Sequence, residues 1–283
     1  MNVKREKCSI IVVLTMSIFI LEWIHCTTSS KNADEYFLTL PREMELKEDT
    51  PQKYNLTVDY FTRDIYGQLM SKKRITAEYT RALPEGKVRW NNVRITSAQN
   101  PKESFSASEL QKYMENFTYK PSDDMLKESF FKDFPPEIME TKVLIWDMVS
   151  IEVWAWNYFD KLSLNEAYRP APDGESFQMA GAGSFQNKDL RLTWLGLSKM
   201  NEELCALIQY ESLFNPLDMG WDSMSIKGRT NYWGNIWVSL EDKQIEYATL
   251  YEDGLLEVTF GEKAEKTLSN VFRDIEFKKD LSP

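Results

Sequence analysis

The feature that most limits what this chain can fold into is an alternation of apolar and polar residues with a period of two. It occurs in Lys53–Phe61, Arg74–Ala82 and Lys87–Ile95, and it returns from about Ser184 almost to the end of the chain. Successive side chains of a β-strand point to opposite faces of the sheet, so this period indicates strands that are buried on one face. The chain must therefore build much of its fold from antiparallel sheet.

The C-terminal part of the chain contains a series of such segments separated by short polar stretches. The segments are Asp189–Ser198, Glu203–Phe214, Trp221–Thr230, Asn231–Leu240, Lys243–Tyr251, Gly254–Phe260 and Ser269–Phe277. We expect turns at Glu241–Lys243 and Glu252–Gly254, and a loop at Asn215–Gly220. Consecutive strands joined by short turns pair with each other, so we predict a meander.

The middle of the chain, at about 105–162, is predicted to be helical. Ser106 followed by Glu109 has the spacing of a capping box, which predicts a short helix over Ala107–Glu115. Ser122 and the two aspartates after it suit the start of a second helix, which must stop before the prolines at 135–136.

The next segment, from Glu137 to Leu162, is apolar almost all round. Its length without Gly or Pro favours a helix, whereas its Val, Ile and Trp content leaves two strands as an alternative. We therefore predict an α+β fold, in which a large curved antiparallel sheet is covered on one face by helices from the middle of the chain.

The N-terminal region is typical of an export signal. A basic start precedes an apolar run from Ser9 to Leu21, which Glu22 closes. This run is shorter than the about 20 apolar residues that a membrane-spanning helix needs. Small residues from Cys26 to Ser30 then offer a cleavage site.

This pattern divides the chain into a signal peptide (1–26), a linker or extended arm (27–52) and a single α+β domain (53–283). Bacterial lipoprotein signals resemble this one in having a cysteine just after the apolar run, so membrane attachment through a lipid on Cys26 is an alternative to plain cleavage, and an uncleaved anchor is a third. We expect a periplasmic, cell-envelope or extracellular location.

Composition removes several kinds of chemistry. The only histidine, His25, lies in the signal region, so the mature chain can run no Ser-His-Asp or Cys-His mechanism and can form no His-containing zinc site. A net charge of -10 disfavours nucleic acid as a partner. We predict no cofactor, no metal site and no catalytic residue.

Two carboxylates, Asp147 and Glu152, interrupt the apolar segment. On a helix their spacing puts them about 140° apart, and on a strand it puts them on opposite faces, which does not favour a catalytic pair. We expect each to mark the wet side of a buried element or to pair with a lysine or arginine.

Aromatic residues mark the candidate binding site. In Asn231–Leu240, residues such as Tyr232 form a normal core face, whereas Trp233 and Trp237 point the other way, and the next strand adds Tyr247. A sheet that is apolar on both faces needs a cover on each, which is either the protein's own helix or loop or a ligand. We therefore predict Trp233, Trp237 and Tyr247 as ligand-binding residues.

The stretch Gly234–Thr259, GNIWVSLEDKQIEYATLYEDGLLEVT, resembles the strand, polar turn, strand pattern in the sheet of periplasmic lipoprotein-carrier proteins and their half-barrel relatives. The resemblance covers about the last third of the chain. It implies a curved antiparallel sheet with helices that close its concave side over acyl chains.

These observations predict an exported, non-catalytic binding protein of the cell envelope with a hydrophobic or amphipathic ligand. Two alternatives remain open. One is a carboxylate-based enzyme acting on glycans, and the other is a structural or interaction module that uses an exposed sheet edge.

The export signal generates the first testable prediction. We expect the exported protein to be cleaved between Cys26 and Ser30, so its intact mass falls below the 33.2 kDa of the full chain. Mass spectrometry of the exported protein measures this directly. A mass matching the full chain contradicts cleavage, and a diacylglycerol adduct on Cys26 identifies a lipoprotein instead.

Overall fold

The structure, a computed structural model, describes residues 50–282 apart from 101, 137, 222–223 and 262–264. The predicted signal peptide and almost all of the predicted arm lie outside the described residues. The described part contains a 13-stranded antiparallel sheet and an α-helix, α2 (Met139–Trp156). Among the described residues, no helix has the length and apolar character needed to cross a membrane.

The N-terminal strands are β1 (Gln52–Asp64), β2 (Leu69–Leu83), β3 (Lys87–Ala98), β4 (Glu109–Leu110) and β5 (Phe117–Tyr119). The C-terminal strands are β6 (Ala167–Tyr168), β7 (Glu175–Gln178), β8 (Gly183–Asn187), β9 (Arg191–Met200), β10 (Glu203–Trp221), β11 (Met224–Ser239), β12 (Ile245–Phe260) and β13 (Glu265–Lys279). Short 3-10 helices are η1 (Pro84–Gly86), η2 (Lys112–Met114), η3 (Asp123–Leu126), η4 (Glu128–Phe131) and η5 (Phe159–Lys161).

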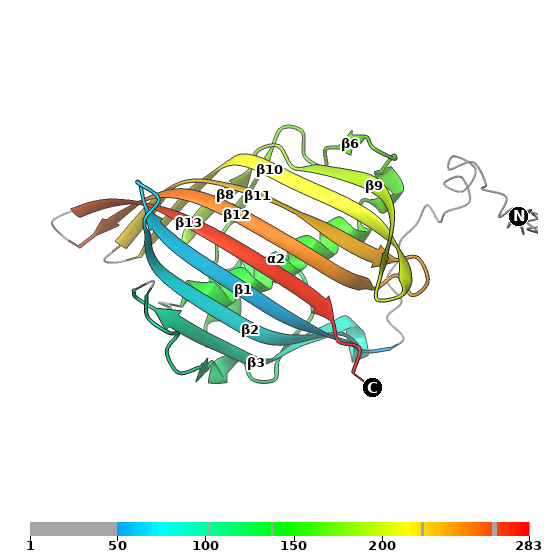
Figure 1. Cartoon of the computed structure of the whole chain (residues 1–283), viewed down its shortest axis with the longest axis horizontal. Helices are drawn as coiled ribbons and strands as arrows, with labels where there is room; N and C mark the ends of the chain where they lie inside the picture. The colour runs from blue at the N-terminus through cyan, green and yellow to red at the C-terminus, as the bar shows by residue number, and fades with distance from the viewer. Residues whose placement is uncertain (1–49, 101, 137, 222–223, 262–264, 283) are drawn as a thin grey trace, which may run out of the picture. The chain divides into compact units, whose positions relative to one another are not determined.

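The order of the long strands across the sheet is β3-β2-β1-β13-β12-β11-β10. Both β8 and β9 then pair with β10, and β7 pairs with β8. The first and last long strands, β1 and β13, are neighbours in the middle of the sheet, as Figure 1 shows. This pairing joins the N-terminal strands to the C-terminal meander, so the predicted large antiparallel sheet is confirmed, and it is not closed into a barrel.

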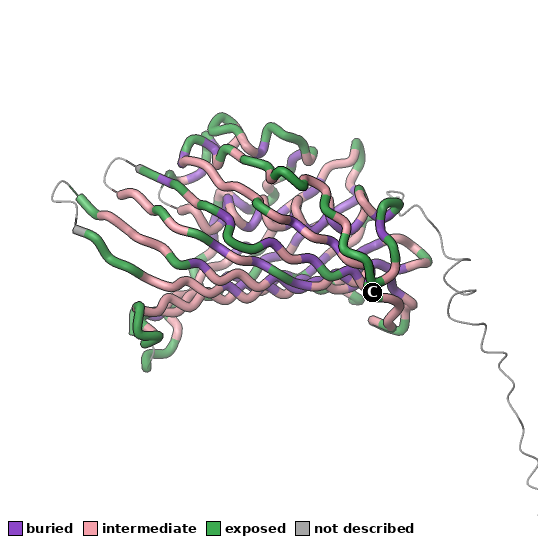
Figure 2. The backbone as a smooth tube through the Cα atoms, turned by 90° about the horizontal axis from the view of Figure 1, so that it is seen from above, coloured by how far each residue is buried: buried purple, intermediate pink, exposed green. Residues whose placement is uncertain are grey.

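Alternation along the strands gives the sheet an inner face, which we define as the face that α2 contacts, and an outer face. Figure 2 shows buried residues alternating with more exposed ones along the strands. On the inner face, the rings of Tyr54 and Phe277 stack with centroids 4.2 Å apart, and those of Tyr79 and Trp90 lie 4.7 Å apart. These four side chains are fully buried, so the inner face of β1, β2, β3 and β13 forms a large part of the core.

Helix α2 confirms the helical interpretation of the middle apolar segment. Its Trp154 packs on Tyr210 of β10 and stacks on Tyr232 of β11, with centroids 4.4 and 5.4 Å apart. Figure 1 shows α2 running across one face of the sheet. The prediction named several covering helices, whereas the described residues contain a single α-helix on this face, accompanied by short 3-10 turns.

The predicted helix over Ala107–Glu115 is wrong. The segment forms β4 and η2, and Leu110 pairs with Arg94 of β3. The hydroxyl of Ser106 accepts a hydrogen bond from the Ser97 backbone N–H at 3.1 Å rather than capping a helix. So short a helix is marginal in water by itself, so this segment pairs with the available strand edge instead. Similarly, the segment after Ser122 forms two short 3-10 helices.

Two predicted breaks in the C-terminal meander are also wrong. Asn215–Gly220 lies within β10, and Glu252–Gly254 lies within β12. Polar residues can occupy a strand when partners satisfy them: Asn215 is buried and bonds to Ser212, and Glu252 forms an ion pair with Arg273. Polarity at these positions therefore indicated side-chain partners rather than turns.

The pairing of β1 with β13 generates a stability prediction. Phe277→Ala should lower the free energy of unfolding by about 3–5 kcal/mol, because it removes a fully buried ring that stacks on Tyr54. Leu268→Ala, on the same strand at a position 48% exposed, is the control and should change it by no more than about 0.5 kcal/mol. Urea denaturation of both variants measures the difference, and equal losses would contradict this account of the core.

Candidate functional site

A cavity of about 1470 Å³ lies between α2 and the inner face of the sheet. Helix α2, the 3-10 segment before it, and strands β7, β8 and β10–β13 all contribute side chains to its lining. Pockets for drug-sized ligands occupy roughly 300–1,000 Å³. The space is therefore large enough for a sizeable organic ligand.

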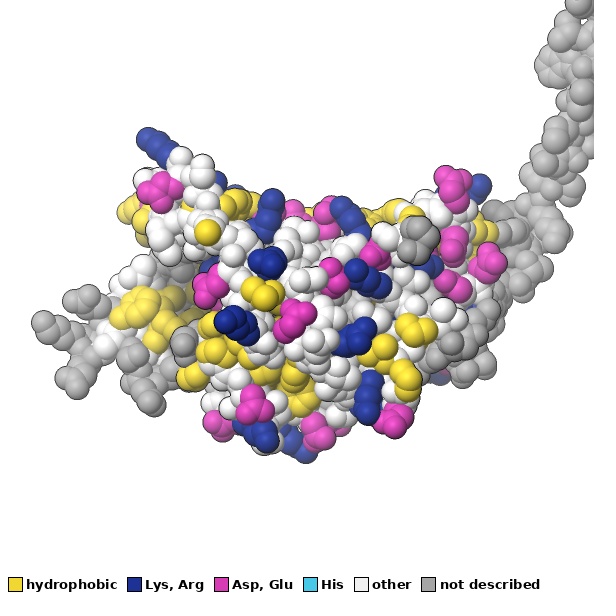
Figure 3. Space-filling view, turned by 90° about the horizontal axis from the view of Figure 1, so that it is seen from below, with side chains coloured by type: hydrophobic (Ala, Val, Ile, Leu, Met, Phe, Trp, Pro, Cys, Tyr) yellow, Lys and Arg dark blue, Asp and Glu magenta, His cyan; other side chains and the backbone are white. Residues whose placement is uncertain are grey.

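Most of the lining is apolar. It includes Met125, Val143, Trp146, Phe177, Phe185, Leu217, Met219, Ile226, Leu250, Leu256 and Phe260. Phe260, near the end of β12, lines the cavity and is also 50% exposed. Figure 3 shows hydrophobic side chains at the surface of one face of the molecule, with charged side chains among them. The apolar lining thus continues to the surface of the molecule.

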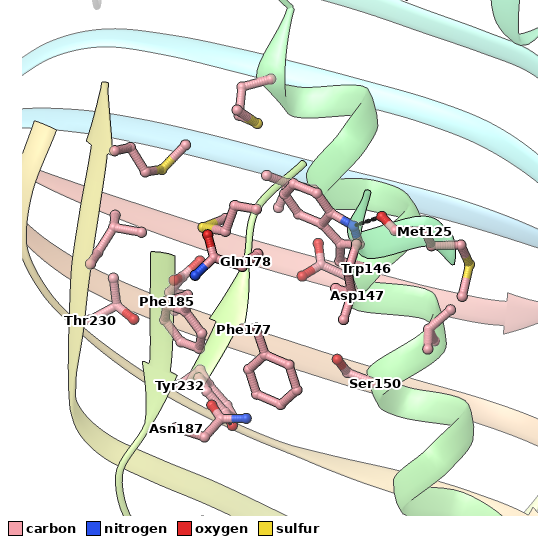
Figure 4. Close-up of a pocket in the computed structure, with 18 of the residues that line it drawn as sticks. Met125, Trp146, Asp147, Ser150, Phe177, Gln178, Phe185, Asn187, Thr230 and Tyr232 are labelled. Carbon is pink, nitrogen blue, oxygen red and sulfur yellow. Dashed lines mark hydrogen bonds between the residues drawn. The ribbon is translucent and has the colours of Figure 1, made fainter. Parts of the chain in front are cut away.

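The surroundings of α2 explain why this helix has no continuous polar face. Its Leu144, Met148 and Ile151 are fully buried on one side of the helix, whereas Val143 and Ser150 line the cavity. A helix with a polar face would suit a surface position, and one without it must be enclosed. In Figure 4, Trp146, Asp147 and Ser150 project from α2 toward the strands that carry Phe185 and Tyr232.

A row of polar side chains crosses the inner face at the cavity. Strand register places Tyr232 opposite Glu252, Glu252 opposite Arg273, and Arg273 opposite Tyr60. All four residues line the cavity. The Arg273 guanidinium donates to both Glu252 and Asp147 of α2, and it lies 5.2 Å from the centroid of the Tyr60 ring.

Burial controls the electrostatics of this row. It raises the pKa of Asp147 to about 6, although the neighbouring Arg273 charge opposes the shift. Burial also raises the pKa of Tyr60, so its hydroxyl stays protonated at neutral pH. Together with Asp147 of α2, the row therefore places two carboxylates and one guanidinium in a largely apolar cavity.

The other carboxylate of the middle segment, Glu152, belongs to a separate buried group. It forms an ion pair with Arg81 at 2.5 Å and accepts a hydrogen bond from the Tyr79 hydroxyl at 2.7 Å. The expectation that Asp147 and Glu152 each pair with a basic residue is confirmed. The two carboxylates thus bind different arginines, Arg273 for Asp147 and Arg81 for Glu152.

Two neutral polar groups complete the lining on the β8 and β11 side. The Tyr232 hydroxyl donates to the Asn187 side-chain oxygen at 2.6 Å. Thr230 is 4% exposed, and its hydroxyl has no hydrogen-bond partner among the described residues. A buried hydroxyl without a partner is unfavourable, and such groups occur where a ligand or water completes the bonding.

The predicted ligand contacts lie on the outer face instead. Trp233 is 39% exposed and its ring lies 6.0 Å from that of Tyr251. The ring of Trp237 lies 5.3 Å from that of Tyr247, whose hydroxyl donates to Glu276 at 3.0 Å. Neither tryptophan nor Tyr247 is part of the cavity lining, so a binding role for them stays a prediction.

Strand β11 therefore contributes to the cavity with the face opposite to the one that carries Trp233 and Trp237. Thr230 and Tyr232 of β11 line the cavity, one residue out of step with Trp233. The sequence signal for this cavity was the middle apolar segment, which predicted a helix that covers one face of the sheet. That helix covers the face of Tyr232, which the alternation indicated as ordinary core. The large indole side chains of Trp233 and Trp237 favoured the opposite face as the predicted binding site.

One group of acidic side chains has the spacing of metal ligands. Carboxylate oxygens of Glu203, Asp242 and Glu246 lie within 4.8 Å of one another. The Lys279 ammonium forms ion pairs with all three, at 3.6 Å from Glu203 and 2.8 Å from Asp242. An internal cation thus already forms an ion pair with each carboxylate of this cluster, and we assign no metal to it.

Comparisons with known proteins place the chain in no family. No family model matches the sequence, and no curated protein matches it. Among solved structures, a lipovitellin structure that describes lipid–protein interactions is similar with a TM-score of 0.38 and 11% identity, over 83% of this chain and 25% of that one. A DUF1329 family protein from Desulfovibrio piger has a TM-score of 0.15 and 6% identity, over 83% of this chain and 89% of that one. This chain thus spans about a quarter of the lipovitellin chain.

The buried row generates a pH-dependent prediction. Between about pH 4 and 6 the folded protein holds the Asp147 proton that the unfolded chain has lost, so the free energy of unfolding falls as pH rises through this window. Asp147→Asn removes this contribution. We expect the stability of the variant, relative to wild type, to rise by about 2 kcal/mol between about pH 4.5 and 7.5.

Denaturant unfolding at several pH values measures this difference. Asp133→Asn replaces an exposed aspartate and is the matched control, for which we expect a much smaller change. If the stability of Asp147→Asn relative to wild type stays constant across this pH range, Asp147 is not a buried carboxyl with a raised pKa.

Proposed function

We propose that this chain is a non-catalytic binding protein for a hydrophobic or amphipathic ligand, held in the cavity between α2 and the inner face of the sheet. The observation that carries the proposal is a cavity of about 1470 Å³ with a mostly apolar lining that continues to the surface. Burial of apolar surface is the main source of affinity for such ligands.

The polar row supports a ligand with two chemically different parts. Glu252, Arg273 and Asp147 occupy one region of a lining that is otherwise rich in methionine, valine, leucine and phenylalanine. A hydrocarbon part would contact the apolar lining, and a polar part would lie near the row. A few placed polar groups in an apolar pocket fix the orientation of a ligand.

A binding role also agrees with the chemistry of the lining. Its carboxylates Asp147 and Glu252 share Arg273, an arrangement that stabilises buried charge rather than activating a nucleophile. The N-terminal pattern that predicts export supports the second part of the proposal, which is that binding takes place in the cell envelope or outside the cell.

Occupation of the cavity can be tested by filling it. Ser150→Trp places an indole into the space that α2 faces, as Figure 4 indicates. We expect it to weaken binding of an uncharged fluorescent amphiphile such as N-phenyl-1-naphthylamine by about tenfold or more, because the ligand and the indole would clash. Fluorescence titration measures the affinity, and circular dichroism with thermal melting verifies the fold.

Ser108→Trp is the matched control, since Ser108 is exposed and lies outside the lining. It should bind the probe as tightly as the wild-type protein does. If wild type fails to bind the probe, or if a folded Ser150→Trp variant binds it unchanged, the proposed function is wrong for this cavity.

A further inference from the structure

The charges of the cavity lining point to a particular class of ligand. We infer that the cavity binds a cationic amphiphile of the long-chain amine type, with its ammonium group beside Thr230 and Glu252. This inference rests on the proposed function and adds the nature of the head group. It follows from the charge balance of the lining, the pairing of its one arginine and the position of the Thr230 hydroxyl.

The lining is strongly acidic. Its acidic residues are Asp123, Glu128, Glu140, Asp147, Glu175 and Glu252, and Arg273 is its only basic residue in the described part of the chain. A cleft with one sign of charge and low-dielectric walls concentrates ligands of the opposite charge. An anionic head group would therefore meet repulsion along the whole lining.

The single arginine does not offset this charge for a ligand. Arg273 already forms ion pairs with both Asp147 and Glu252 through its two terminal nitrogens, so an anion could bind these nitrogens only by displacing a buried carboxylate. Displacing one partner would leave a buried charge uncompensated, which is strongly unfavourable. Only the buried Nε–H of Arg273 has no partner in the described structure, so the guanidinium acts mainly as the counter-ion of these two carboxylates.

The acidic residues nearer the surface differ in their pairing. Glu140 forms an ion pair with Lys73 of β2. Glu128 and Glu175 are exposed and make no ion pair with a basic residue in the described part of the chain. These two carboxylates are therefore available to attract a cation to the cavity.

Thr230 gives the head group a position. Register pairs Thr230 with Gly254 and Tyr232 with Glu252, so Thr230 and Glu252 are diagonal neighbours on the inner face. The Thr230 hydroxyl is buried without a partner in the described structure and can accept a hydrogen bond. An ammonium group has three donors and no acceptor, which matches a hydroxyl oxygen beside a carboxylate.

A set of three ligands with the same alkyl chain tests the charge preference. Decylammonium, decanol and decanoate are each titrated against the protein loaded with N-phenyl-1-naphthylamine, at pH 7.5, where the amine and the acid are both charged. We expect decylammonium to displace the probe at a concentration about tenfold or more below that of decanoate, with decanol between them. The ratio should fall as salt is raised, because salt screens the exposed carboxylates.

Two variants locate the charge and the head group. Glu128→Gln combined with Glu175→Gln should reduce the ratio between decylammonium and decanoate and leave decanol binding unchanged. Glu103→Gln combined with Glu109→Gln, at exposed positions outside the lining, is the matched control and should keep the ratio. Thr230→Val keeps the shape of the side chain and should weaken decylammonium binding by about threefold or more.

The outcomes separate this inference from the proposed function. If decanol binds and decanoate binds as tightly as decylammonium, the cationic preference is wrong and the proposed function stands. If none of the three displaces the probe, both are wrong. Unchanged binding of decylammonium to a folded Thr230→Val variant would overturn the placement of the head group.

Discussion

The rest of the structure depends on the pairing of β1 with β13. This pairing runs from Tyr54 opposite Lys279 to Asp64 opposite Ser269, and it joins strands from the two ends of the described chain into one sheet. Without it, each group of strands would expose an unpaired edge, which is a site for aggregation. It also places Tyr60 beside Arg273, so the polar row of the cavity exists only once the two ends have met.

Helix α2 is fixed to the sheet by two buried ion pairs. Asp147 binds Arg273 of β13, and Glu152 binds Arg81 of β2. Removing either partner of such a pair would leave an isolated buried charge, so the four residues specify one position for the helix. Held in this position, α2 packs one side against the core and presents Val143 and Ser150 to the cavity. The cavity and the position of the helix thus have the same physical cause.

Much of the fold was predictable from the sequence because its signals are local. Period-two alternation marked β1, β2 and β3, and the long apolar segment without Gly or Pro marked α2. The predictions were wrong where contacts with distant residues outweighed a local pattern. The sequence predicted a turn at Glu252, whereas Glu252 lies within β12 and forms an ion pair with Arg273. It predicted a helix over Ala107–Glu115, whereas this segment pairs with the edge of β3.

The sequence by itself determined that the chain forms antiparallel strands, that a long apolar segment lies in its middle, and that no histidine follows His25. Only the tertiary structure decided which sheet face holds the cavity. Alternation divides β11 into two faces, one with Tyr232 and one with Trp233, and a pattern of period two carries no information on which face a distant helix will cover. The ion pairs of α2 fix the helix on the inner face, and they join residues that are far apart in the sequence: Asp147 and Arg273 are separated by 126 positions.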